Sequence, residues 1–127
     1  MSRENTELVR RLFAAVDRQD WEAVLGFFYP DVEWCPTEGT FRGLEGVVSS
    51  MVEWFEPWEE HDIEAEEFSE AGDEVLAVVR LTGRGVASGV EIDQRFFQVY
   101  AVRNGKIIRM VEFVTRDEAL EAAGLKE

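Results

Sequence analysis

The chain has 127 residues, 46% of them apolar, and a formal net charge of -14 at pH 7. This length is typical of a single domain with a buried core, and we expect one domain over residues 1–127. The excess of acidic side chains opposes binding to nucleic acid or to anionic membrane surfaces. No apolar run approaches the roughly 18 residues of a membrane span, the one cysteine, Cys35, can form no internal disulfide, and no apolar signal core follows Met1. A cytoplasmic protein is expected.

The first half of the chain predicts three helices and one short strand. Apolar residues at helical spacing indicate a helix that ends near residues 18–19, and Asp20 is placed to cap a second helix that Pro30 stops. A short strand is expected at 32–35. A third helix from about Leu44 ends near Pro57 and carries an apolar and aromatic side, with Val47, Met51, Trp54, Phe55 and Trp58.

The second half predicts an antiparallel meander. Alternating or β-rich runs at 61–69, 75–82, 90–102 and 106–114 indicate four strands. Asn104-Gly105 between the last two is the typical sequence of a two-residue hairpin turn. Thr115 and Glu118 form a capping box for a short final helix, which Gly124-Leu125 ends. The expected class is therefore α+β.

Strict alternation from the Asn104-Gly105 turn pairs Arg103 with Lys106 and sorts the hairpin into two faces. The first face carries Arg95, Phe97, Val99, Ala101, Ile108, Met110, Glu112 and Val114. The second carries Phe96, Gln98, Tyr100, Val102, Ile107, Arg109, Val111 and Phe113. Both faces are mostly apolar, and the helices can cover only one of them. We therefore expect a homodimer across the second face, through Phe96, Gln98, Tyr100, Val111 and Phe113.

Five segments resemble the SnoaL-like branch of the nuclear-transport-factor-2-like superfamily. They are Leu8–Ala15, Asp20-Trp21, Phe28–Trp34, Asn104–Ile107 and Glu118–Leu125. The resemblance implies a cone-shaped fold in which three N-terminal helices wrap a curved antiparallel sheet around a pocket, with a short C-terminal helix. The superfamily includes ketosteroid isomerases, limonene-epoxide hydrolases, polyketide cyclases and inert scaffolds, so the fold alone assigns no reaction.

The resemblance tests two of these activities residue by residue. The catalytic tyrosine of the isomerases aligns with Leu12, and their protonated aspartate falls near Phe97 or Gln98, so isomerase chemistry is not expected. In the epoxide hydrolases an aspartate on the last strand aligns with Glu112 and an arginine with Arg80. Their second acid aligns with Thr82, a poor proton donor, unless Asp93 or Glu38 supplies it.

Glu112 and Arg80 are therefore the candidate catalytic pair, with Glu112 as general base and Arg80 orienting it or the substrate; a structural ion pair is the alternative. The candidate substrate-binding residues are Trp34, Met51, Trp54, Phe55, Trp58, Phe97, Val99 and Met110, for which core packing is the alternative. The single histidine, His61, lies in an acidic stretch and suits neither catalysis nor a histidine-rich metal site.

Two functions remain open. The first is a cofactor-independent enzyme that binds a small apolar molecule and performs hydrolase, cyclase or isomerase-type acid/base chemistry. The second is a non-catalytic ligand-binding or dimeric scaffold protein, favoured by the missing acid at Thr82. A cavity of roughly 300 Å³ or more that opens to solvent, with Glu112 not fully paired to Arg80, would favour an enzyme or a ligand-binding protein, and a collapsed cone would favour the scaffold.

Overall fold

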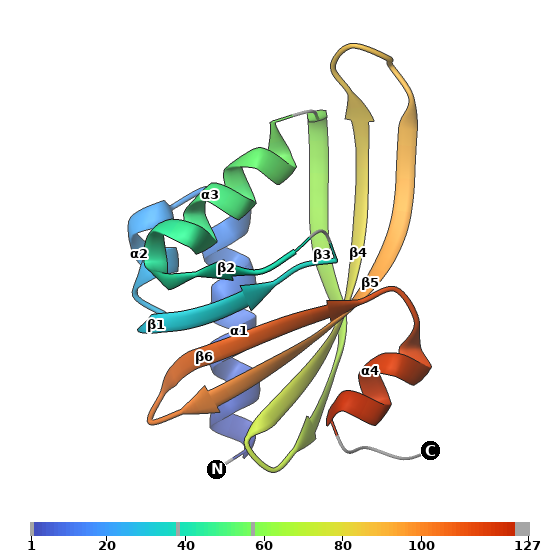
Figure 1. Ribbon diagram of the computed structural model, residues 1–127. Helices are drawn as coiled ribbons and strands as arrows, with labels where there is room; N and C mark the ends of the chain where they lie inside the picture. The colour runs from blue at the N-terminus through green and yellow to red at the C-terminus, as the bar shows by residue number, and fades with distance from the viewer. Residues whose placement is uncertain (1, 38, 57, 124–127) are drawn as a thin grey trace.

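The fold was analysed in a computed structural model that describes residues 2–37, 39–56 and 58–123 (Figure 1). The helices are α1 (Ser2–Asp17), α2 (Trp21–Leu25), α3 (Gly43–Phe55) and α4 (Arg116–Ala123). The strands are β1 (Phe28–Cys35), β2 (Phe41–Arg42), β3 (Trp58–Ala71), β4 (Glu74–Gly85), β5 (Glu91–Arg103) and β6 (Lys106–Phe113). They form one curved, unclosed sheet in the order β2-β1-β6-β5-β4-β3, so the predicted α+β class is confirmed. No helix in these ranges is both long enough and apolar enough to cross a membrane.

The second helix starts as predicted but ends earlier. Asp20 caps α2, with its side chain accepting a hydrogen bond from the Ala23 N–H at 3.2 Å. Phe28 and Pro30 belong to β1 instead of the helix end. The pairing of β1 with β6 is irregular between Phe28 and Glu33. Pro30, which has no backbone N–H, is tolerated in this stretch because the regular ladder of hydrogen bonds is already broken there.

The predicted meander β3-β4-β5-β6 is confirmed, together with its last turn. Asn104 and Gly105 have φ angles of 51° and 75°, as a type I′ turn requires, and Arg103 pairs with Lys106. The register then shifts at Ala101–Val102, because Val102 pairs with Ile107 whereas Ala101 pairs with Arg109. Ile108 is thus an extra residue in β6, a β-bulge that reverses the facing of every later residue relative to β5.

This bulge makes the predicted division of the hairpin into two faces wrong. Gln98 pairs with Glu112 and Tyr100 with Met110, so these four side chains share one face. Phe97 pairs with Phe113 and Val99 with Val111 on the other. Phe96, Gln98 and Tyr100, which we expected at a dimer interface, therefore lie on the same side of the sheet as Glu112.

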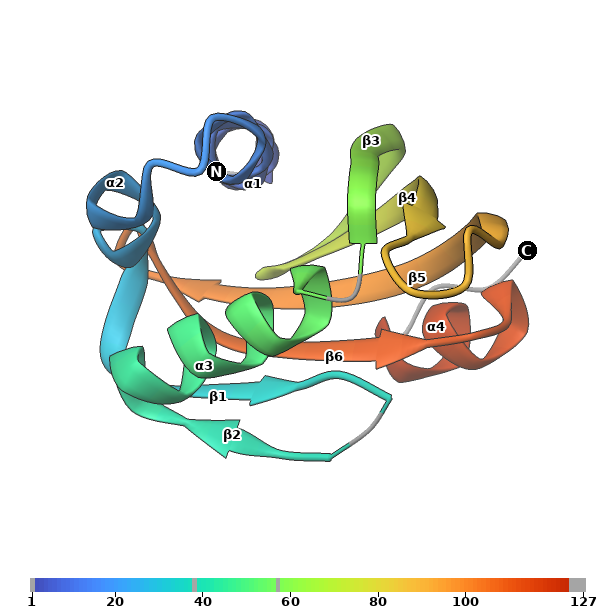
Figure 2. The same ribbon diagram turned by 90° about the horizontal axis from the view of Figure 1, so that it is seen from above.

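Helices α1, α2 and α3 gather on the concave side of the sheet, as Figure 2 shows. The main core lies between them and the sheet. Val9 and Leu12 of α1, Val47 of α3 and Tyr100 of β5 are at most 1% exposed there. This arrangement confirms the predicted cone with three N-terminal helices.

Helix α4 packs on the opposite, convex side (Figures 1 and 2). Its Ala119 and Ala123 are buried in a second cluster with Leu76 of β4 and Val99 of β5, beside Phe97 and Phe113. The Thr115 cap of α4 is confirmed, since the Glu118 N–H donates to the Thr115 hydroxyl. The Glu118 carboxylate accepts from this hydroxyl, whereas in a full capping box it would accept from the Thr115 N–H. We expected the face of the hairpin away from the three N-terminal helices to lack a helix, and this expectation is wrong because α4 covers part of it. The expected stop at Gly124-Leu125 lies outside the described residues.

Candidate functional site

A cavity of about 80 Å³ that opens to solvent lies between the concave face of the sheet and the helices α1 and α3. Apolar side chains from both helices and from strands β3 to β6 make up most of its wall, and Pro36 closes one side after β1. Met110 is fully buried at its base. This volume is below the roughly 300 Å³ that we expected of an enzyme or a ligand-binding protein, so that criterion is not met. A cavity of roughly 150 Å³ holds benzene, so a ligand of that size must displace lining side chains.

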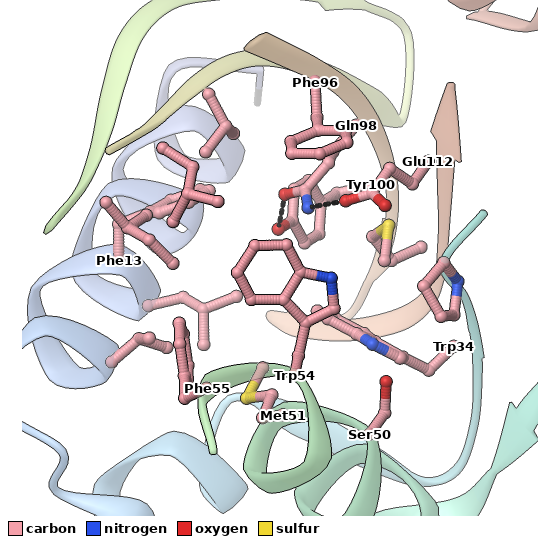
Figure 3. Close-up of a pocket in the computed structure, with 17 residues that line it drawn as sticks. Phe13, Trp34, Ser50, Met51, Trp54, Phe55, Phe96, Gln98, Tyr100 and Glu112 are labelled. Atoms are coloured by element: carbon pink, nitrogen blue, oxygen red, sulfur yellow. Dashed lines mark hydrogen bonds between the residues drawn. The ribbon is translucent and has the colours of Figure 1, made fainter. Parts of the chain in front are cut away.

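Aromatic rings dominate the wall. Trp54, on the last turn of α3, packs edge-on against Phe96 with ring centroids 6.2 Å apart and against Phe55 at 5.8 Å. Trp34 contacts Tyr100 at 6.3 Å. Figure 3 shows the Trp54 ring projecting between these groups. Such a wall suits a flat apolar ligand, which it can contact through ring faces and edges.

The polar end of the cavity is a short chain of hydrogen bonds (Figure 3). The Tyr100 hydroxyl donates to Gln98 Oε1 at 2.5 Å, and Gln98 Nε2 donates to Glu112 Oε1 at 2.7 Å. The Thr37 N–H donates to Glu112 Oε2 at 3.4 Å. Burial, and secondly the charge of Glu112, raise the pKa of Tyr100 well above its usual range, so this phenol stays protonated and donates.

The structure separates Arg80 from Glu112, and the prediction that they form one site is wrong. The inward-facing residues of β4 around Arg80 are Val79 and Leu81, which line the cavity, so Arg80 projects from the convex face. There its guanidinium binds the Asp93 carboxylate through two hydrogen bonds of 2.9 and 2.7 Å. These bonds raise the pKa of Arg80 and lower that of Asp93.

A second ion pair extends this charged patch. The Arg95 guanidinium bonds to Glu66 at 2.7 Å, and Arg95 lies directly across from Arg80 in the sheet. The positive charges of Arg80 and Arg95 are therefore each balanced by a neighbouring carboxylate. Glu112 is the sole carboxylate among the described residues that line the cavity, and Arg80 is not among these residues. The two other acids considered from the sequence do not change this, since Asp93 is on the convex face and Glu38 lies outside the described part of the chain.

Some of the residues predicted to bind substrate line the cavity, and others do not. The cavity is lined by five of the predicted residues: Trp34, Met51, Trp54, Phe55 and Met110. The placement of Phe97 and Val99 there is wrong, because the bulge at Ile108 turns them toward α4. The eighth predicted residue is Trp58, whose side chain is not among those that the structure describes.

Sequence reasoning missed Gln98 and Tyr100 because it assumed unbroken alternation. The signal that could have placed them is Gln98 itself, a polar residue in an otherwise apolar row that fits better opposite Glu112 than opposite a second molecule. His61 is not at the polar end; its ring stacks on Phe55 with centroids 4.5 Å apart.

Comparison with known proteins identifies the family. The SnoaL-like domain matches residues 9–110, most of the chain. The chain belongs to the SnoaL-like family. An uncharacterized protein of Mycobacterium tuberculosis is 33% identical over 123 residues, which cover 91% of this chain and 92% of that protein.

Solved structures of other SnoaL-like and related proteins share the fold. A putative SnoaL-like polyketide cyclase from Jannaschia sp. CCS1 superposes with a TM-score of 0.81 at 23% identity, covering 97% of this chain and 92% of that one. TerC, co-crystallised with polyporic acid, gives a TM-score of 0.79 at 23% identity, covering 94% and 97%. At this identity the likeness shows the fold alone.

The structure shows where the positions of the isomerase tyrosine and aspartate lie in this SnoaL-like cone. Leu12 lines the cavity, so the position of the isomerase tyrosine is inside the site but offers no donor. Of the two residues near the position of the isomerase aspartate, Gln98 reaches the cavity. The chain keeps a polar group there, but an amide cannot transfer a proton as a carboxylic acid does.

Proposed function

We propose that this chain binds a small apolar molecule in the cone and that Glu112 acts there as a proton acceptor. The observation that carries the proposal is the lone carboxylate in an otherwise apolar, aromatic lining, counted over the described residues. A pocket that is mostly apolar with a few convergent polar groups is the usual form of a small-molecule site. The structure of TerC, which was co-crystallised with polyporic acid, supports a ligand-binding role for this chain.

The geometry suits acid/base chemistry of hydrolase, cyclase or isomerase type. Gln98 and Thr37 hold the two carboxylate oxygens of Glu112 by donating to one each. The carboxylate takes a proton from a bound water or from an acidic C–H, whose bond breaks as the new O–H bond forms. In the first case the electron pair stays on the water oxygen, which bonds to a carbonyl carbon of the ligand while the C=O π electrons move onto the carbonyl oxygen. In the second case the pair stays on the ligand carbon, where an adjacent carbonyl delocalises it.

Localised ligand binding is the first test. Phenol, a small aromatic probe, should shift the ¹⁵N–¹H signals of the Trp54 indole and of the Gln98 side-chain amide in a saturable NMR titration. The Arg80 Nε–H signal should not move, because this group is bonded to Asp93 on the far face of the sheet. Shifts confined to Arg80 and its neighbours, with none in the cavity, would refute the proposal.

A non-catalytic binding protein is the second candidate. The specific observation in its favour is that no second acid accompanies Glu112 in the described lining, so a leaving group finds no carboxylic acid to protonate it. The two candidates differ in one measurement. Ligands that bind in the cavity and are recovered unchanged after long incubation with the protein support the binding protein.

We also propose a homodimer, now through the convex face. Val111 and Phe113 are partly exposed on this face, whereas the other three predicted interface residues line the cavity. Burying these apolar groups against a second copy removes them from water. Light scattering at micromolar concentration should give twice the 14.6 kDa of the chain, and Val111→Lys should return it to 14.6 kDa. A wild-type mass of one chain would contradict the dimer.

A further inference from the structure

Two hydrogen bonds between side chains at the polar end of the cavity run in the same direction. Tyr100 donates to Gln98, and Gln98 donates to Glu112, which receives a further hydrogen bond from Thr37. An ionised carboxylate has acceptor sites only, about four over its two oxygens. This chain of hydrogen bonds therefore ends at Glu112, an acceptor that lines the cavity.

The direction of this chain is fixed from both ends. Turning the Gln98 amide over would set its oxygen against a Glu112 oxygen at 2.7 Å, which is repulsive, and would deprive the Tyr100 hydroxyl of its acceptor. Tyr100 is only 1% exposed, so water cannot replace that acceptor at low cost. Gln98 consequently holds its N–H toward Glu112, which stabilises the carboxylate form.

We propose that this directed chain of hydrogen bonds makes the cavity selective for apolar ligands that carry an O–H donor, such as a phenol or an enol, over ethers and carboxylates. The inference rests on the function proposed above and names its ligand class. A donor forms a charge-assisted hydrogen bond with Glu112, whereas an ether oxygen in the same place meets the carboxylate lone pair to lone pair.

The surroundings of Glu112 support rejection of anions. Helices α1 and α3, strands β3 and β4, and the segment after β1 contribute only uncharged side chains to the described lining, and β5 contributes Gln98 and the protonated Tyr100. A ligand carboxylate would thus meet a like charge with no lysine, arginine or histidine in that lining to offset it. The overall charge of -14 acts in the same direction.

Three matched probes test the selectivity. Phenol should bind the wild-type protein at least about tenfold more tightly than anisole, its methyl ether, because a hydrogen bond to a charged group is lost. Benzoate should bind more weakly still. Dissociation constants come from NMR titration of the Trp54 indole signal. Equal affinity for phenol and anisole would overturn the selectivity and leave the proposed binding function intact, whereas no binding of either would overturn both.

Two variants assign the selectivity to its residues. Glu112→Gln, which offers a donor as well as an acceptor, should bring the phenol-to-anisole ratio close to one, and Glu45→Gln on the exposed side of α3 should not. Gln98→Leu should move the pH midpoint of phenol binding upward, because the carboxylate loses a donor that favours its charged form. The control Gln94→Leu changes an exposed residue of the same strand. A purely structural role of Gln98 would lower thermal stability without moving that midpoint, and an unmoved midpoint overturns its positioning role.

Discussion

Glu112→Gln is expected to lower kcat/KM by about 10²- to 10⁴-fold, the usual contribution of a positioned general base. The replacement is nearly isosteric, and its amide oxygen can still accept from Gln98 Nε2, although its amide nitrogen then faces the Thr37 N–H and that 3.4 Å hydrogen bond is lost. What disappears is the negative charge and the ability to take a proton. The loss should therefore be in kcat more than in KM.

The measurement is product formation from a ligand that the NMR titration localises to the cavity. Glu45→Gln is the matched control, because it makes the same chemical change at an exposed position of α3. Thermal unfolding of both variants separates a chemical effect from a loss of folded protein. Turnover by Glu112→Gln at the wild-type rate would show that Glu112 is not the base and would favour the binding protein.

The sequence predicts the elements of this fold well because their signals are local. The Asp20 cap, the Thr115 cap and the Asn104-Gly105 turn each depend on a few neighbouring residues, and each is confirmed. The aromatic side of α3 was also predictable from helical spacing, and it places Met51, Trp54 and Phe55 on the cavity.

The composition of the site was only partly predictable, because facing in a sheet is not a local property. A single extra residue, Ile108, exchanges the two faces of β5 relative to the end of β6. It moves Gln98 and Tyr100 into the site and Phe97 and Val99 out of it. Nothing in the alternation of β5 or β6 taken alone marks the bulge, since both rows of side chains are largely apolar.

Arg80 shows a second limit. Its position among apolar residues suggested a buried partner for Glu112, but a guanidinium on a half-buried strand takes whichever carboxylate its own face supplies. On the convex face that is Asp93, one strand away. Identifying the partner required the facing of β4 relative to β6, which depends on the complete register of the sheet.

Leu76→Ala is expected to lower the free energy of unfolding by about 3 kcal/mol, within the range for truncating a buried leucine. Leu76 is 1% exposed and packs beneath α4 with Val99, Ala119 and Ala123. Alanine leaves a cavity between two rigid elements, the sheet and the helix, and neither can move far enough to fill it. The stability of the convex face thus depends on this contact.

Urea denaturation measures the loss, and Val86→Ala is the control. Val86, which follows β4, is 61% exposed, so its truncation should change the free energy by no more than about 0.5 kcal/mol. Hydrogen exchange should also show faster exchange of the α4 amides in Leu76→Ala than in Val86→Ala, because α4 loses its main buried contact while β4 and β5 keep their ladder. If the two variants had equal stability and equal α4 exchange, α4 would not cover this face in solution, and the buried Leu76 and Val99 would also be available to a second copy of the chain.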